Sequence, residues 1–165
     1  PFFILIGYYT GSRAQAILDL RWRPGPAGGH VSLEAGRIDF NPVGRQPTNK
    51  GRAVVPLPPA LAVVLKALRR RGAETVIAAS DASAVGSIKK SFRTAAAAAG
   101  VPWATPHVLR HTCITHLLLA GQNRYDVSKW AAISMAELER TYGHHAPDYL
   151  ETVAQSWRAR RLPEG

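Results

Sequence analysis

The chain is short of cysteine, of acidic residues and of long apolar runs. Cys113 is its only cysteine, so no disulfide can form within the chain, and a buried thiol in a reducing compartment fits best. The apolar run Phe2–Tyr9 is too short to span a bilayer, and it lacks the charged start and the cleavage site of a signal peptide. These absences argue against a disulfide-stabilised secreted domain and against a membrane protein, and Phe2–Tyr9 is expected to be a core element.

The scarcity of acid leaves the chain strongly basic. Its 21 lysines and arginines face 11 aspartates and glutamates, which gives a net charge of +10. This balance favours a polyanionic partner. Nucleic acid is favoured over an anionic membrane surface, because the cations are spread over several elements and no basic amphipathic helix with an exposed apolar face stands out. A cationic surface that serves only solubility is the alternative.

Several enzyme motifs are also missing. The sequence contains no triad with a serine nucleophile, no Walker loop and no HExxH motif. With 165 residues, of which 46% are hydrophobic, the chain can bury one core. Internal repeats and interdomain linkers are absent, so we expect a single domain.

The periodicity of the apolar residues predicts an α+β domain that is mostly α-helical and carries a small antiparallel three-stranded sheet. Ser12 and Gln15 are spaced as a capping box, which puts Arg13 in the first turn of a helix. Val76–Ala79 is predicted to be either a short strand or a buried connector. The expected strands are Val31–Leu33, Arg37–Phe40 and Arg52–Leu57. The other expected helices open at Pro58-Pro59 and end at Arg69–Gly72, or cover Ile88–Ala99, Pro106–Leu119, Tyr125–Ala132, Ser134–Tyr142 and Pro147–Trp157.

One predicted helix carries most of the candidate chemistry. It starts with Thr105 as N-cap and Pro106 in the first turn, and it stops before Gly121. A core stripe recurs every four residues at Leu109, Cys113 and Leu117. On a neighbouring face, spaced i, i+3 and i+4, lie His107, Arg110 and His111. A guanidinium between two imidazoles near a helix N-terminus suits an anion, and phosphate is the natural guest.

Four segments in order resemble one family. They read Thr-Gly-Ser-Arg before Leu-Arg-Trp, a basic hairpin ending Val-Val-Pro-Leu, then Pro-His-Val-Leu-Arg-His-Thr, then Arg-Thr-Tyr-Gly-His-His. This succession resembles the catalytic domain of the tyrosine recombinases, also called the phage integrase family, from about Phe2 to Trp157. The resemblance implies site-specific DNA recombination or integration, by strand breakage and rejoining through a covalent 3′-phosphotyrosyl intermediate. It implies no metal and no other cofactor.

Five residues match the family's catalytic positions. Arg13 and Arg110 match its two arginines, and planar bidentate cations suit the charge that builds on two phosphate oxygens. Tyr142 matches the nucleophile, whose phenol must lose a proton. His107 matches the histidine that accepts this proton. Lys50 is the only lysine of the hairpin and is the predicted acid that protonates the departing 5′-oxygen.

The sequence departs from the family pattern at three places, one of which is Lys50, which lies nearer its strand than the family lysine often does. Ile133 stands where the family usually has a second histidine or a tryptophan, and it cannot donate a hydrogen bond. Either packing suffices there, Trp130 or His144 substitutes, or activity is reduced. Ala16 stands where an acid commonly follows the first arginine. His111 is predicted to support the site from behind or to be a capped core residue.

Each residue also has a structural interpretation. Tyr142 lies on an apolar stripe with Met135 and Leu138 and taken alone would be a core residue. His107 and His111 have the spacing of metal ligands, but no flanking carboxylate completes a site. The basic side chains either contact DNA phosphates without reading bases or are solvated faces. They are the hairpin residues Arg45 and Arg52, and Lys89, Lys90 and Arg93 on the outer face of a helix.

The resemblance also implies partners and a setting. Residues 1–165 would be a catalytic domain truncated at its N-terminus, without the core-binding domain that precedes it in the family, and residues 158–165 would be a flexible tail. The partner would be double-stranded DNA, with self-assembly to a tetramer in the synapse and accessory DNA-bending proteins, in the cytoplasm of a prokaryote or phage host at the nucleoid. The alternatives are a DNA-binding module of the same fold without catalysis, and an RNA-binding or ribosome-associated basic protein.

Overall fold

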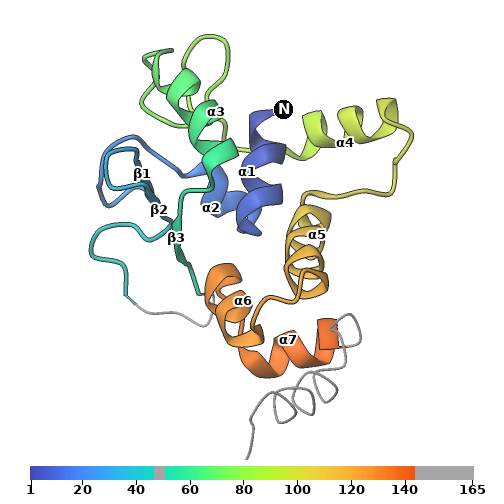
Figure 1. Ribbon diagram of the computed structural model, residues 1–165. Coiled ribbons are helices and arrows are strands. Elements are labelled where there is room, and N and C mark those ends of the chain that lie inside the picture. Colours follow the sequence, from blue (N-terminus) through green and yellow to red (C-terminus); the bar gives the residue numbers. More distant parts are fainter. Residues whose placement is uncertain (47–50, 144–165) are drawn as a thin grey trace, which may run out of the picture.

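The structure, a computed structural model, describes residues 1–46 and 51–143 (Figure 1). Lys50, His144, the predicted helix Pro147–Trp157 and the predicted tail 158–165 lie outside the described residues. The helices are α1 (Phe2–Thr10), α2 (Ala14–Leu18), α3 (Pro59–Arg69), α4 (Lys89–Ala98), α5 (Pro106–Leu119), α6 (Arg124–Ala131) and α7 (Met135–Tyr142). The strands are β1 (His30–Ser32), β2 (Arg37–Asp39) and β3 (Val54–Pro56), in antiparallel order β1-β2-β3. The predicted mixed, mostly helical fold class is confirmed.

The larger core forms around α1, which packs against α2, α3 and α5. Across the sheet, Val31 pairs with Ile38 and Ile38 pairs with Val55, and all three side chains are buried. One face of the short sheet therefore closes this core, and Figure 1 shows the sheet to one side of α1 and α2. The larger core also contains, among others, Phe3, Ile6, Ile17, Leu20, Phe40, Leu61, Leu65 and Phe92.

The smaller core lies at the other end of α5. Figure 1 shows α6 and α7 gathered there, away from α3. α6 packs against α5 and α7. The buried members of the smaller core are Ile114, Leu118, Val127, Ala131, Ile133, Leu138 and Tyr142. The side chain of the candidate nucleophile is therefore part of a hydrophobic cluster.

The predicted helix signals have mixed outcomes. Ser134 Oγ accepts from the backbone N–H of Glu137 at 3.2 Å, as expected for the start of α7. The box at Ser12 is wrong: α2 starts at Ala14, and Arg13 is its extended N-cap residue. The reason is Gly11, whose left-handed backbone (φ 62°) ends α1 so sharply that no turn remains for Ser12 to cap.

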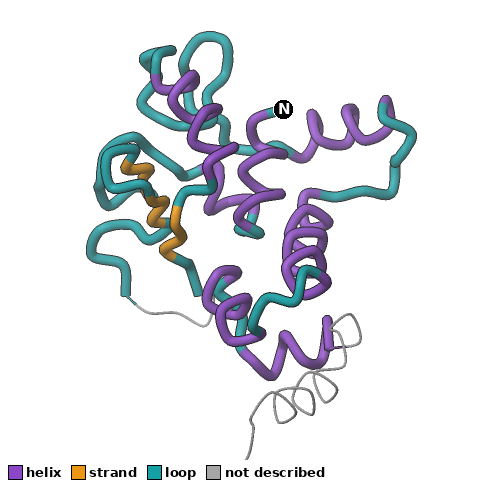
Figure 2. Tube along the Cα trace, viewed as in Figure 1, coloured by secondary structure: helices purple, strands orange, loops and turns teal. Residues whose placement is uncertain are grey.

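Two further expectations are confirmed. Phe2–Tyr9 is a core element and lies within a helix, and of the two alternatives for Val76–Ala79 the structure has the buried connector, inside the long loop between α3 and α4 (Figure 2). In α5 the buried stripe is displaced by one residue: Leu109 and Leu117 are half-buried, whereas Arg110, Ile114 and Leu118 are buried beside Cys113. The cause is that α5 packs against α1 on one side and α6 on the other.

No helix among the described residues combines the length and apolarity needed to cross a bilayer.

Candidate active site

Arg110 is the most buried cation of the described chain. Its side chain comes from the first turns of α5, and the residue is only 4% exposed. Nη1 donates to the carbonyl oxygen of Gly11 at 2.8 Å and to that of Ala131 at 2.6 Å, so one guanidinium links the ends of α1 and α6. Burial, and then the nearby charge of Arg13, lower the pKa of Arg110 from its ordinary value. Nη2 is buried and has no hydrogen-bond partner among the described residues, which leaves a donor for an oxyanion.

Arg13 approaches Arg110 from the N-terminus of α2. Its Nη1 donates to the carbonyl oxygen of Gly51 at 2.8 Å. Gly51 packs closely against Ala132: a Cβ added at Gly51 would lie 3.3 Å from the Cβ of Ala132, a tight contact. Arg13 and Arg110 line the same small cavity, together with Gly51 and Ala132. Folding thus brings together the two predicted clamp residues, which lie nearly a hundred positions apart in the sequence.

Tyr142, at the last position of α7, points back toward α5. Its hydroxyl lies 2.8 Å from Nδ1 of His111, and the two rings are 5.4 Å apart at their centroids. The residue is only 3% exposed. Burial raises the pKa of the phenol, and the neighbouring charge of Arg110 partly opposes this shift. The phenol therefore stands near a guanidinium of the clamp, in its neutral form.

His107 lies one turn before His111 and meets it edge to face. The ring centroids are 4.7 Å apart and the planes are nearly perpendicular, at 89°. Burial, followed by the charges of His111, Arg110 and Arg13, lowers the pKa of His107, which favours the neutral ring. His107 and Arg13 line one groove between α2 and the start of α5. The phenol is hydrogen-bonded to His111 rather than to His107, the residue predicted to accept its proton.

Ile133 lies in an apolar environment. Ile133 is 8% exposed and packs in the smaller core. Trp130, one of the predicted substitutes, donates its indole N–H to the carbonyl oxygen of Tyr9 at 3.3 Å, so its polar edge is engaged within the fold. Between them, Ala132 ends α6 in a left-handed conformation with φ 47°. This turn carries the Ala131 carbonyl that Arg110 binds.

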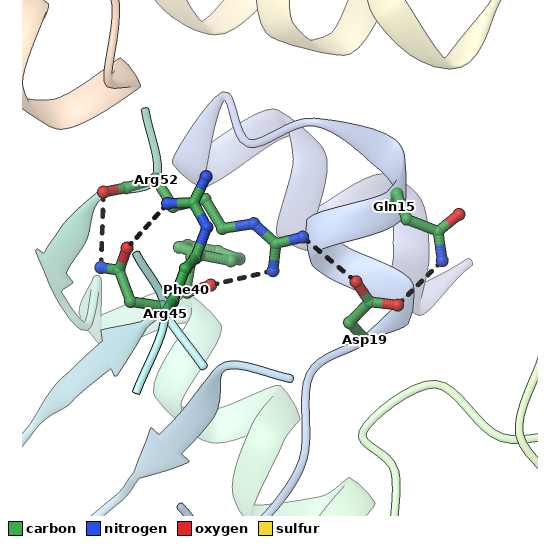
Figure 3. Close-up of polar contacts among 6 residues, drawn as sticks. Gln15, Asp19, Phe40, Arg45 and Arg52 are labelled. Atoms are coloured by element: carbon green, nitrogen blue, oxygen red, sulfur yellow. Dashed lines mark hydrogen bonds and ion pairs between the residues drawn. The ribbon is translucent and has the colours of Figure 1, made fainter. Parts of the chain in front are cut away.

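The hairpin cations Arg45 and Arg52 bind polar groups within the fold (Figure 3). Arg52 donates to the Phe40 carbonyl oxygen at 3.1 Å and pairs with Asp19 Oδ2 at 3.3 Å. The other oxygen of this carboxylate accepts from Gln15 Nε2 at 2.8 Å. Arg45 binds the Asn41 side chain at 3.4 Å. Arg52 is therefore a link between α2 and the base of the hairpin, and its assignment as a DNA contact stays a prediction.

Sequence analysis missed this link because a lone aspartate after a helix carries no motif. The spacing of Gln15 and Asp19, four residues apart, was the available signal. The predicted basic face is present: Lys89, Lys90 and Arg93 are exposed on α4. Within residues 1–46 and 51–143, no three histidine, cysteine, aspartate or glutamate side chains are grouped so that they could hold a metal ion.

Comparison with known proteins identifies the family. The sequence model described as Phage integrase family matches residues 2–148, so the chain belongs to the phage integrase family. No curated protein matches the sequence. Twenty-three solved chains match its fold. The sequence match shows the family, and the solved chains show the fold.

Three of the similar structures are recombinases or integrases. The XerA recombinase matches with a TM-score of 0.66 and 18% identity, over 95% of this chain and 57% of its own. The catalytic domain of bacteriophage HP1 integrase has a TM-score of 0.66 and 21% identity, over 93% of this chain and 79% of its own. The Tn1549 transposon integrase, in complex with a circular intermediate DNA, has a TM-score of 0.73 and 14% identity, over 95% and 57%. The present chain spans only 57% of the length of XerA.

Proposed function

We propose that the protein is the catalytic part of a site-specific DNA recombinase that cuts and rejoins strands through a covalent 3′-phosphotyrosyl intermediate on Tyr142. The observation that carries the proposal is the convergence of Arg13, Arg110 and Tyr142. The two guanidiniums line one small cavity, and each of Arg110 and Tyr142 shifts the pKa of the other. A phenol beside paired guanidiniums is suited to attack on a phosphodiester.

The chemical step balances with these groups alone. The phenol oxygen of Tyr142 forms a bond to phosphorus while the bond from phosphorus to the 5′-oxygen breaks. The phenol proton passes to a histidine of α5, and the departing 5′-oxygen takes a proton from an acid, for which Lys50 stays the predicted residue. Arg13 and Arg110 neutralise the charge on the two non-bridging oxygens, and removing such donors costs about 10²–10³ in rate. Rejoining runs the same steps in reverse.

Double-stranded DNA is the proposed substrate. The Tn1549 integrase is solved with circular intermediate DNA, and the XerH recombinase is bound to its difH substrate. In this chain the cations of α4 would contact phosphates, since their side chains are exposed to solvent. Self-assembly to a tetramer on DNA and accessory DNA-bending proteins are proposed with the same activity.

The second candidate is a DNA-binding module without catalysis. It is favoured by Ile133, which puts an apolar side chain where the family has a donor, and by the low exposure of the Tyr142 phenol. In this case the basic surface binds DNA and no covalent product forms.

Covalent trapping separates the two candidates. The protein is incubated with a pool of nicked duplexes of randomised sequence, in which a cleaved strand loses a short fragment and cannot be resealed. We expect denaturation-resistant adducts whose DNA converges on one sequence, and we expect none from Tyr142→Phe. Retention of DNA without any adduct, in both proteins alike, would establish the binding module instead.

A further inference from the structure

A histidine of α5, His111, is hydrogen-bonded to the candidate nucleophile. Its Nδ1 lies 2.8 Å from the hydroxyl of Tyr142, across the junction between α5 and α7. We propose that His111, and not His107, takes the proton from Tyr142 when the phenol attacks phosphorus. This inference rests on the proposed function and assigns one catalytic residue within it.

The geometry allows a direct transfer. With the proton of the neutral imidazole on Nε2, Nδ1 presents its lone pair to the phenol. The O–H bond of Tyr142 breaks, an N–H bond forms at Nδ1, and the electron pair left on oxygen forms the bond to phosphorus. A hydrogen-bond distance between the proton donor and its acceptor is the first requirement for such a base.

Because the phenol of Tyr142 is buried, its attack is favoured by a proton acceptor that already contacts it. Burial raises the pKa of Tyr142, so the phenolate is scarce before the reaction starts. The charge of Arg110 favours the phenolate, but burial is the larger of the two causes. A base that already holds the phenol can remove the proton during attack, so a free buried anion need not form beforehand.

His107 is placed behind His111 rather than beside the phenol. Its contact is the edge-to-face packing with the His111 ring. It is the more exposed of the two, and its lowered pKa favours the neutral form, so it adds no second positive charge next to a newly formed imidazolium. His107 is therefore suited to hold the His111 ring in place without placing a second positive charge beside it.

A nucleophile of altered acidity tests the assignment. Adduct formation is timed on the nicked duplex selected with the natural protein, for His111→Gln and for the matched control His107→Gln. Each is measured with tyrosine and with 3,5-difluorotyrosine at position 142, because the fluorinated phenol loses its proton more readily and depends less on a base. His111→Gln should slow the reaction by about 10²-fold or more, and fluorination should recover at least about tenfold of that loss. The loss in His107→Gln should be smaller and should recover less.

Several results would overturn the inference. If His111→Gln forms the adduct at the natural rate or faster, His111 is not the base, and its hydrogen bond only restrains the phenol of Tyr142. A loss in His111→Gln that fluorination does not recover would make the residue structural, and recovery confined to His107→Gln would return the role to His107. If His111→Gln fails to fold, His111→Asn is measured in its place. A natural protein that forms no adduct refutes the proposed function itself, which is a separate outcome.

Discussion

The larger and the smaller core contribute different parts of the candidate site. The larger core fixes a cation: Arg13 extends from the start of α2 and binds the Gly51 carbonyl, beside the ion pair of Arg52 with Asp19. The smaller core fixes the nucleophile: Tyr142 is one of its buried members. In the proposed reaction, one part of the molecule would bind the phosphate, and the other would hold the group that attacks it. The site depends on how the two cores are joined.

Arg110 is the joint. Its guanidinium binds the carbonyl oxygen at the end of α1, in the larger core, and the one at the end of α6, in the smaller core. The same side chain is a predicted member of the phosphate clamp. Arg110 therefore has a structural role and a predicted chemical role. Substituting it tests whether the two cores depend on this one side chain.

Removing this joint should give the largest effect. Arg110→Ala leaves two buried carbonyl groups without their donor and should lower the free energy of unfolding by about 3 kcal/mol. Arg13→Ala, which loses one bond to a partly buried carbonyl, should lower it by about 1 kcal/mol. Urea unfolding measures both. Hydrogen exchange should also show α6 and α7 opening before α1 in Arg110→Ala. Equal losses of unfolding free energy in Arg110→Ala and Arg13→Ala would contradict the role of Arg110 as the link between the two cores.

Alkaline pH should loosen the same junction through Cys113, whose Sγ faces Gly11 at the end of α1. Burial raises the pKa of this thiol from 9.0 to about 11. As the pH rises, the thiol loses its proton in the unfolded chain before it does so in the folded chain. The stabilisation of the folded chain by the neutral thiol is therefore complete below about pH 9 and declines as the pH rises toward 11. The loss should be about 1 kcal/mol by pH 10 and about 2 kcal/mol by pH 11.

Tyr142 shifts in the same direction and adds to the decline at higher pH. Urea unfolding of the natural protein and of Cys113→Ala between about pH 8 and pH 11 separates the two contributions. The difference between the proteins should narrow as the pH rises, and a constant difference would show that the thiol does not titrate as described.

A smaller effect should be confined to the larger core. Arg52→Gln removes the ion pair with Asp19 and should lower the free energy of unfolding by about 1 kcal/mol, since both side chains are partly exposed. The salt dependence of DNA binding should stay unchanged, because this guanidinium is engaged within the fold. A flatter salt dependence of DNA binding in Arg52→Gln, with an unchanged free energy of unfolding, would instead indicate that Arg52 contacts a phosphate.

The smallest effect on stability should come from α4. Lys89→Ala should leave the free energy of unfolding within about 0.5 kcal/mol, because the side chain is exposed. If Lys89 contacts a phosphate, the slope of log K against log salt should flatten by about 0.9 on any DNA sequence. Binding titrations at several salt concentrations measure the slope, and a change limited to one sequence would instead indicate base reading.

Local signals in the sequence located most elements of the fold. Pro106 and the Ser134 capping box mark helix starts that the structure reproduces, and the apolar alternation located all three strands to within a few residues. The helix at Ser12 was placed one residue too early, since Gly11 ends α1 in a left-handed conformation, close to Cys113. Gly11 alone cannot reveal that.

The site was less predictable than the fold. Periodicity assigned Leu109 to the buried stripe of α5, yet the buried residue is its charged neighbour Arg110. A guanidinium can be buried there only because two helix ends present carbonyl oxygens to it, and both ends are remote in sequence. The pairing of Tyr142 with His111 has the same origin, since it arises where α7 meets α5.

Ala132 adopts a backbone conformation that costs a residue with a side chain about 1 kcal/mol. Glycine at this position would relieve that strain, and selection for heat resistance alone would favour it. The methyl group of Ala132, however, also fills the space beside Gly51, and its turn presents the carbonyl that seats the buried guanidinium. An Ala132→Gly protein should therefore be more resistant to heat but hold Arg110 less rigidly, and covalent trapping should show slower adduct formation if the proposed reaction holds.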